Sequence, residues 1–211
     1  MIEFAPGLLY FPDFYSRLEQ EALASLLRDA VKAAPLFTPL MPRTGKPFSV
    51  RMTNFGALGW VSDREHGYRY EARHPQTGEE WPAIPDLVLR AWRETSNYPH
   101  DPEACLMNFY DVSARMGLHQ DRDEAALDAP VVSISLGDSC LFRIGSETRG
   151  GKTRSSKLHS GDVVVIGGAS RLAFHGVDRI FPATSTLLPN GGRINLTMRR
   201  VRAAENLATG G

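Results

Sequence analysis

The sequence predicts a single domain that is mainly β, with helices near the N-terminus and a double-sheet barrel in the C-terminal half. A length of 211 residues suits one domain. Apolar residues recur at helical spacing early in the chain. From Ala104 onward they fall into short runs separated by turn residues, which is typical of a sandwich or barrel. The helices are expected to cover one face of a sheet.

The first helix is predicted over residues 16–34, and Pro35 ends it. Ser16 and Glu19 have the spacing of a capping box, in which two side chains satisfy backbone N–H groups at the start of the helix. The apolar residues at helical spacing are expected to face the core: Leu18, Leu23, Leu26, Leu27 and Val31.

Between this helix and residue 97 the sequence predicts one strand and one more helix. Residues 48–55 suit a strand, whereas residues 60–80 are polar and aromatic with little periodicity, which indicates a loop or an irregular hairpin. The second helix is expected over residues 85–97, with Leu87, Val88 and Trp92 turned inward.

The C-terminal half contains several short apolar runs that predict strands. They cover residues 105–110, 130–136, 141–144, 163–166 and 193–201. A loose cluster of basic residues interrupts the series, and it is expected either to be a solvated loop or to form a local basic groove. The cluster consists of Arg143, Arg149, Lys152, Arg154 and Lys157.

Composition excludes several classes of protein. With 42% apolar and 23% charged residues the chain resembles an ordinary globular protein, and it has no apolar run of about 18 residues that would span a membrane. Its 24 basic and 24 acidic residues cancel, which argues against a sequence-blind coat on duplex nucleic acid. The N-terminus lacks the pattern of a signal peptide. Cys105 and Cys140 are expected to be buried free thiols, so we expect a cytoplasmic protein.

Three residues carry the most specific chemistry. His119 and Asp121 lie two residues apart, so that on an extended segment both side chains point to the same side. His175 follows 54 residues after Asp121 and must reach them from a distant strand or loop. Two imidazoles and one carboxylate hold one face of a ferrous ion and leave the opposite positions open for a co-substrate and O₂. Gly117 and Gly176 are expected to give backbone freedom near the metal.

A zinc hydrolase can use a similar set of ligands, with Asp123 or Glu124 as general base, but the segment 193–199 favours iron. This segment alternates strictly, so that Arg193, Asn195, Thr197 and Arg199 share one face of a strand. The two arginines are separated by about 20 Å at about 3.3 Å per residue. We therefore expect Arg193 or Arg199 to pair with the far carboxylate of a dicarboxylate and the other to support the metal end. The alternative is an exposed edge strand whose arginines discourage aggregation.

These motifs together resemble the AlkB family of iron(II)- and 2-oxoglutarate-dependent dioxygenases. The likeness rests first on three segments: His119-Gln120-Asp121 with Asp123, Arg171 to Gly176, and the R-x-N-x-T-x-R pattern from Arg193 to Arg199. It also extends to shorter matches at Met52-Thr53-Asn54, Leu58-Gly59-Trp60, Gly67 to Tyr70, Pro75-Gln76-Thr77 and Trp81-Pro82.

The resemblance implies one domain over residues 1–211, with a jelly-roll (double-stranded β-helix) core over about residues 104–201 and a nucleotide-recognition lid over about residues 48–85. It also implies the roles of individual residues. Iron would bind to His119, Asp121 and His175. 2-Oxoglutarate would bind among Asn108, Tyr110, Arg193, Asn195, Thr197 and Arg199, with Arg193 on its far carboxylate. The substrate would contact Met52, Trp60, Tyr68, Tyr70, Asp123 and Arg149.

For the substrate, the resemblance implies that Trp60 and His175 sandwich a base while Asp123 contacts its exocyclic amino group. The residue types suit these tasks, because aromatic side chains stack bases with about 1–3 kcal/mol each and a carboxylate accepts from an N–H₂ group. Taken alone, the aromatic residues between Trp60 and Tyr70 also fit a pair of core aromatics under a loop, and Asp123 also fits a solvated acid.

The activity that the resemblance implies is oxidative demethylation of 1-methyladenine and 3-methylcytosine in DNA, with RNA as a second candidate polymer. It would require Fe(II), 2-oxoglutarate and O₂, and would yield succinate, CO₂ and formaldehyde. A monomer acting on single-stranded or damaged double-stranded DNA is expected, because flipping a base costs least there. Two alternatives remain besides the zinc hydrolase: a dioxygenase acting on a small molecule or protein side chain, and a catalytically silent nucleic-acid-binding module.

Overall fold

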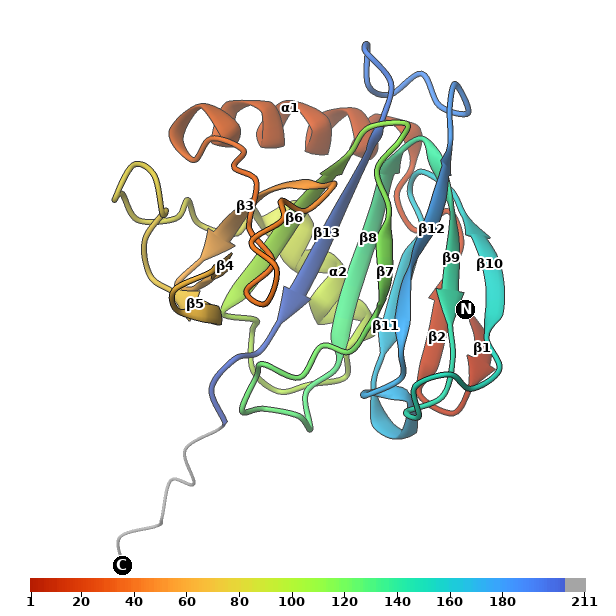
Figure 1. Ribbon diagram of the computed structural model, residues 1–211. Coiled ribbons are helices and arrows are strands. Elements are labelled where there is room, and N and C mark those ends of the chain that lie inside the picture. The colour runs from red at the N-terminus through yellow and green to blue at the C-terminus, as the bar shows by residue number, and fades with distance from the viewer. Residues whose placement is uncertain (204–211) are drawn as a thin grey trace, which may run out of the picture.

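Two antiparallel sheets pack face to face in the computed structural model, which is described over residues 1–203 (Figure 1). In spatial order, the larger sheet contains β1 (Ile2–Ala5), β2 (Leu8–Phe11), β11 (Val163–Ile166), β8 (Val131–Gly137), β13 (Arg193–Arg199), β6 (Ala104–Tyr110) and β3 (Arg51–Gly56). The smaller contains β10 (Arg154–Leu158), β9 (Ser139–Ile144), β12 (His175–Phe181) and β7 (Met116–His119). The chain passes repeatedly between the sheets, which confirms the predicted jelly-roll core.

Alternation along β13 divides its side chains between two environments. Ile194, Leu196 and Met198 belong to the apolar core beneath the helices. The opposite face, which carries the two arginines predicted to act together, lines a pocket between the two sheets. The strict sequence alternation of residues 193–199 therefore predicted the two faces of this strand correctly.

The helices α1 (Arg17–Ala33) and α2 (Asp86–Thr95) cover the outer face of the larger sheet (Figure 1). The capping box is confirmed, because the Glu19 N–H donates to Ser16 Oγ and the Ser16 N–H donates to Glu19 Oε2. The prediction that Leu18 and Leu26 face the core is wrong, because they are 76% and 45% exposed. The buried stripe follows the helical period through Gln20, Leu23, Ala24 and Leu27, and Leu18 and Leu26 fall outside it.

The predicted irregular hairpin is a regular one, formed by β4 (Gly59–Asp63) and β5 (Gly67–Glu71). Trp60 pairs with Tyr70 and Ser62 pairs with Tyr68. This hairpin forms its own two-stranded sheet beside β3 (Figure 1). Neither strand has an apolar run to reveal it, because β5 has no buried residue and Val61 is the one aliphatic residue of β4.

Five strands were not predicted: β1, β2, β7, β10 and β12. The alternative that the basic cluster is a solvated loop is wrong for Arg154 and Lys157, which lie on β10, whereas Arg143 lies on β9, within the strand predicted over residues 141–144. β10 is an edge strand of mostly exposed polar residues, so it has no apolar run to reveal it. A 3-10 turn, η1 (Gly168–Ser170), separates β11 from the segment that leads to β12.

The two cysteines are buried free thiols, as expected. Among residues 1–203, neither helix has the length and apolar composition needed to cross a bilayer. The second core, between the two sheets, ends where polar residues of β13, β6 and β12 begin to line the pocket.

Candidate metal and co-substrate site

Two neighbouring strands of the smaller sheet bring the histidines together. His119 ends β7 and His175 begins β12, and the two residues are direct partners in the antiparallel register. Gly176 permits this approach: a Cβ at that position would lie 2.5 Å from the carbonyl oxygen of Met116 and 2.8 Å from that of Gly117. The role of Gly176 is therefore close packing of two backbones and not the backbone freedom that was expected.

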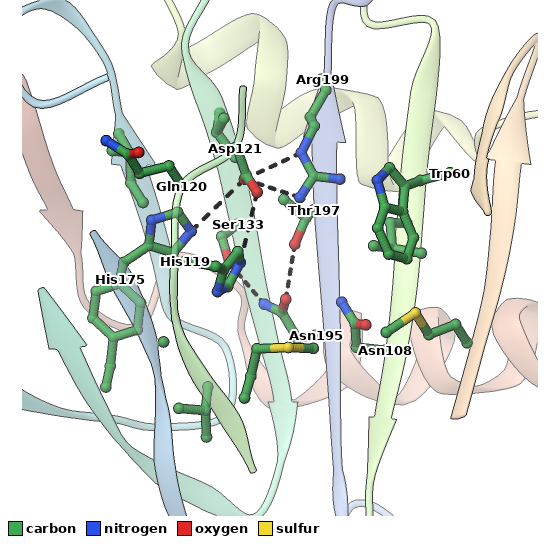
Figure 2. Close-up of a pocket in the computed structure, with 18 of the residues that line it drawn as sticks. Trp60, Asn108, His119, Gln120, Asp121, Ser133, His175, Asn195, Thr197 and Arg199 are labelled. Carbon is green, nitrogen blue, oxygen red and sulfur yellow. Dashed lines mark hydrogen bonds and ion pairs between the residues drawn. The ribbon is translucent and has the colours of Figure 1, made fainter. Parts of the chain in front are cut away.

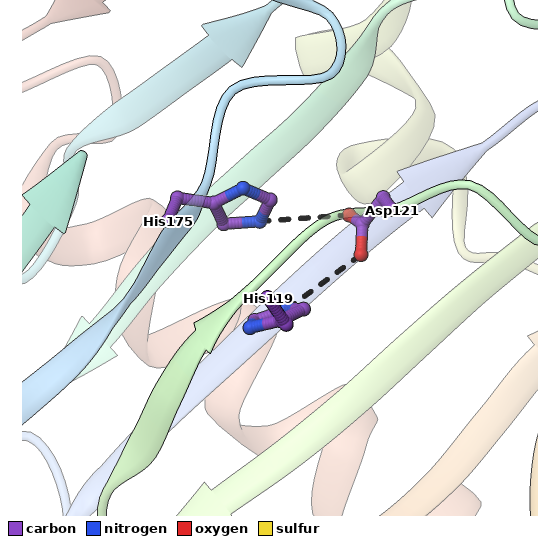
Figure 3. Close-up of side chains that lie close together, drawn as sticks. All are labelled: His119, Asp121 and His175. Atoms are coloured by element: carbon purple, nitrogen blue, oxygen red, sulfur yellow. Dashed lines mark ion pairs between the residues drawn. The ribbon is translucent and has the colours of Figure 1, made fainter. Parts of the chain in front are cut away.

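The three predicted iron ligands converge (Figure 3). His119 Nε2 lies 3.6 Å from Asp121 Oδ1, and His175 Nε2 lies 3.7 Å from Asp121 Oδ2. In each histidine Nδ1 contacts a backbone carbonyl, that of Gly117 at 2.9 Å and that of Ala173 at 3.0 Å. A carbonyl only accepts, so Nδ1 carries the proton and the lone pair of Nε2 is directed toward the shared site.

The charges of this group suit a cation. Burial lowers the pKa of His175 from 6.5 to about 4, and the neighbouring His119 adds to the shift, so His175 is neutral near pH 7. Burial alone would raise the pKa of Asp121, but the charge of the Arg199 guanidinium and its hydrogen bonds outweigh it and hold that pKa well below its usual range. Two imidazoles and one carboxylate are the ligand set expected for a ferrous ion.

Arg199 holds the carboxylate in place. Its Nε and Nη2 donate to Asp121 Oδ2 at 3.1 and 2.9 Å (Figure 2), and its Nε lies 3.4 Å from Glu124 Oε1. Sequence reasoning considered Glu124 only as a possible base for zinc chemistry and did not predict this contact. Arg171 completes the buried cluster, since it donates to Glu124 Oε2 and to the backbone carbonyl of Asp121. The fixed carboxylate supports the predicted role of Arg199 at the metal end.

Arg193 is the residue best suited to a second carboxylate. Its side chain is 1% exposed, and among residues 1–203 only Nη2 has a partner, Ser135 Oγ at 2.9 Å. Within the same described residues, Nε and Nη1 are buried without a hydrogen-bond partner, and so is Asn108 Oδ1 on the adjacent strand. An unpaired buried guanidinium is costly unless an anion completes it. The residues present therefore fit the distal carboxylate of 2-oxoglutarate.

Asn195 and Thr197 line the same pocket but are bonded mainly to the protein. Asn195 Nδ2 donates to Ser133 Oγ and to the carbonyl of Ile134, while its Oδ1 accepts from Thr197 Oγ1 (Figure 2). Tyr110 is buried and also lines the pocket. Burial raises the pKa of Tyr110 above its ordinary value, so its hydroxyl remains a hydrogen-bond donor.

The pocket has a volume of about 260 Å³ and opens beneath the hairpin of β4 and β5, which we call the lid hairpin. Trp60 lies across the pocket from His119 (Figure 2) and stacks on Tyr68, with ring centroids 5.4 Å apart. Its Nε1 donates to Asp123 Oδ2 at 3.0 Å. Met52 and Phe48 also line this side, and Phe48 meets Trp60 edge-on. An aromatic platform and a carboxylate thus stand at the mouth above the metal ligands.

Known proteins with similar sequences and folds agree with this geometry. A protein-family model described as the 2OG-Fe(II) oxygenase superfamily matches residues 7–199. An alpha-ketoglutarate-dependent dioxygenase AlkB homolog of Caulobacter vibrioides is 50% identical over 199 residues, which cover 94% of this chain and 90% of that protein. The chain belongs to the AlkB family of iron(II)- and 2-oxoglutarate-dependent dioxygenases.

Two further comparisons extend the AlkB likeness. The alpha-ketoglutarate-dependent dioxygenase AlkB of Escherichia coli K12 is 40% identical over 190 residues, covering 88% of this chain and 86% of that protein. The solved structure titled "The structure of OsALKBH1" superposes with a TM-score of 0.74 at 32% identity, covering 94% of this chain and 100% of that one. The enzyme is therefore a dioxygenase that uses Fe(II), 2-oxoglutarate and O₂, and the zinc hydrolase and the silent binding module are set aside.

Two residues expected to contact the substrate of this AlkB-family enzyme do not line this pocket. Tyr70 is not among the residues that line the pocket, and its hydroxyl donates to Glu124 Oε1. Arg149 stacks on Phe174, with its guanidinium 5.6 Å from the ring centroid, and lines a separate cavity together with Gly145 and Thr153. The remaining predicted contacts, Met52, Trp60, Tyr68 and Asp123, do line the pocket.

Proposed function

We propose that this enzyme removes N-methyl groups from 1-methyladenine and 3-methylcytosine in single-stranded or damaged double-stranded DNA, with RNA as a second candidate polymer. The observation that carries the proposal is the aromatic platform of Trp60 and Tyr68, placed at the mouth of the metal pocket with Asp123 beside it. A planar base that leaves its stack needs an aromatic surface and a partner for its polar edge. A small aliphatic substrate needs neither.

The chemistry is divided among the residues by position. When bound, iron and 2-oxoglutarate supply, with O₂, the oxidising power that converts an N-methyl group to a hydroxymethyl group, which leaves as formaldehyde. His119, Asp121 and His175 would hold the metal. Arg193 orients the co-substrate through its two unpaired donors, and Arg199 keeps Asp121 oriented.

The mouth of the pocket selects the base. Trp60 and Tyr68 offer a stacking surface worth about 1–3 kcal/mol per base. Among residues 1–203, Asp123 Oδ1 has no hydrogen-bond donor, while Oδ2 is held by Trp60, so Oδ1 is free to accept from an exocyclic amino group. Since the chain has no net charge, few phosphate contacts offset the cost of flipping, which favours single strands.

Related proteins support a nucleic-acid substrate. One relative from Schizosaccharomyces pombe is named a tRNA demethylase, and one from Arabidopsis thaliana a DNA N(6)-methyladenine demethylase. The two names point to the same class of reaction on different polymers, which is why both DNA and RNA belong in the test.

The test uses purified protein with Fe(II), 2-oxoglutarate and a single-stranded oligonucleotide that carries one 1-methyladenine. We expect the oligonucleotide to lose the mass of one methylene group, with one formaldehyde and one succinate formed per base repaired. The same sequence as RNA measures the polymer preference, and the unmethylated oligonucleotide is the control. Succinate release with no mass loss on any methylated oligonucleotide would contradict the proposal and favour a small-molecule or protein substrate.

The cellular compartment and the oligomeric state of the enzyme are also proposals. Two buried free thiols suit a reducing compartment, so we place the enzyme in the cytoplasm. We also propose that it acts as a monomer, because a single chain already brings His119, Asp121 and His175 together with Arg193 and Arg199. Sedimentation at the concentration of the activity assay tests the monomer.

A further inference from the structure

The segment that follows β7 carries three carboxylates within the four residues 121–124, and each has a different partner. Asp121 faces the two histidines of the metal site. Asp123 accepts from Trp60 on β4, and Glu124 accepts from Tyr70 on β5. Both strands of the lid hairpin are thus hydrogen-bonded to the turn that carries a metal ligand.

Only the bond from Tyr70 continues to the metal ligand itself through side chains. Tyr70 Oη lies 2.5 Å from Glu124 Oε1, and the same oxygen lies 3.4 Å from Arg199 Nε. Arg199 in turn donates twice to Asp121 Oδ2. The side chains of Glu124, Arg199 and Asp121 are all more than nine-tenths buried, so little water is present to replace a lost partner.

Arg171 holds the other side of the cluster. It donates to Glu124 Oε2 at 3.1 Å and to the backbone carbonyls of Asp121 and Ala129. The two oxygens of Glu124 therefore have separate tasks: Oε2 is fixed to Arg171, and Oε1 is shared between Tyr70 and Arg199. Without the phenol, Oε1 retains only the longer contact to Arg199, and Glu124 can rotate toward that guanidinium.

We propose that Tyr70 is a positioning residue that orients the metal ligand Asp121 through Glu124 and Arg199, and so couples the lid hairpin to metal binding. Partners of metal ligands tune affinity even when they do not touch the metal. The coupling must be reciprocal, so a bound metal steadies the lid to the same extent that the anchored lid favours the metal. This inference depends on the metal centre and not on the substrate.

The hydroxyl of Tyr70, which donates to Glu124, stays protonated near neutral pH. Burial raises the pKa of Tyr70 well above its ordinary value, and the nearby Glu124 carboxylate adds to the shift. The hydroxyl can therefore serve only as a steady link.

The test replaces Tyr70 by Phe, which removes one oxygen and keeps the ring. Co(II) serves as the probe, because its visible d–d bands report the geometry of the ligands without turnover. We expect Tyr70→Phe to bind Co(II) about 3- to 10-fold more weakly, at the lower end of the effect of outer partners, with altered d–d bands. In hydrogen exchange, Co(II) should slow the amides of residues 59–71 in the wild type and have little effect in the variant.

Two matched controls separate coupling from the loss of any hydrogen bond. Trp60→Phe removes the other link between lid and turn, to Asp123, and should leave Co(II) affinity within about 2-fold of the wild type. Tyr98→Phe removes a tyrosine-to-carboxylate bond outside the pocket, to Asp128, and should change neither reading. Glu124→Gln is a second probe of the series of side-chain contacts from Tyr70 to Asp121. It keeps an acceptor for Tyr70 but weakens the interaction with Arg199, and should also lower Co(II) affinity.

Wild-type Co(II) affinity and spectrum in both Tyr70→Phe and Glu124→Gln would overturn the proposal, as would an unchanged response of the hairpin amides to Co(II) in Tyr70→Phe. If Tyr70→Phe does not fold, Glu124→Gln decides alone. Since no oligonucleotide is present, these results are independent of whether the enzyme demethylates a base.

Discussion

The floor and the mouth of the pocket are built in different ways. The floor consists of His119 and Asp121 at the end of β7 and of residues on β13, β6 and β12, most of which are almost fully buried, with Arg193 only 1% exposed. The mouth consists of Trp60 and Tyr68 on the lid hairpin and of Asp123 after β7, where Tyr68 is 50% exposed and Asp123 is also exposed. Ladder hydrogen bonds fix the floor, whereas a few side-chain bonds hold the mouth in place.

This difference separates two functions within one cavity. A rigid, water-poor floor is suited to binding the metal and an anionic co-substrate in one geometry. An exposed aromatic mouth held by a few hydrogen bonds can open to admit a base. Variants of the floor should therefore weaken or abolish cofactor binding, and variants of Trp60, Tyr68 or Asp123 at the mouth should change the reaction with the substrate alone.

The largest effect is expected from His119→Ala on the floor. This change removes one of the three residues proposed to bind the metal, and because the side chain of His119 is 40% exposed, the fold should survive. We expect Co(II) affinity to fall more than about 100-fold and turnover to become undetectable. Calorimetric titration with Co(II) checks this, with circular dichroism as the control. Retained Co(II) affinity would remove His119 from the ligand set.

The next effect is expected from Arg193→Met, which should separate binding from stability. Two charge-assisted hydrogen bonds to 2-oxoglutarate would be lost, so its affinity should fall about 100-fold. The ligand-free variant should be more stable by about 1 kcal/mol, because two buried unpaired donors are removed. Calorimetry with 2-oxoglutarate and thermal unfolding measure the two quantities. Arg149→Met, outside the pocket, is the control, and a destabilised Arg193→Met would show that its donors are satisfied in the ligand-free state.

A smaller effect is expected where the two histidine strands touch. In Gly176→Ala the new Cβ would collide with backbone oxygens of β7, costing about 1–3 kcal/mol and separating His119 from His175. We expect Co(II) affinity about 10-fold lower. Gly117→Ala is the matched control, because a Cβ there meets nothing within 4 Å. Equal Co(II) affinities of the two variants would show that strand contact does not set the site.

The smallest effect is expected far from the pocket. Ser16→Ala removes the capping box of α1 and should cost about 1 kcal/mol of unfolding free energy, seen as a melting temperature lower by about 2–4 °C. Binding of Co(II) and 2-oxoglutarate should not change, since α1 contacts the outer face of the sheet. A weaker Co(II) affinity would mean that the floor is less rigid than its ladder bonds indicate.

The floor could be predicted from the sequence and much of the mouth could not. Strict alternation in residues 193–199 gave the pocket face of β13, and the spacing of His119 and Asp121 gave their common direction. The positions of Tyr70 and Arg149 depend on tertiary contacts, with Glu124 and Phe174, that no local pattern encodes. β10 and β12 were missed because edge strands and ligand-bearing strands carry polar residues where the pattern requires apolar ones.

The division between floor and mouth is tested most directly by Trp60→Ala. Binding of Co(II) and of 2-oxoglutarate should stay within about 2-fold of the wild type. Demethylation of a single-stranded 1-methyladenine oligonucleotide should fall about 5- to 150-fold, in line with a stacking loss of about 1–3 kcal/mol. Wild-type demethylation by Trp60→Ala, or a loss of Co(II) binding equal to its loss of activity, would contradict this account.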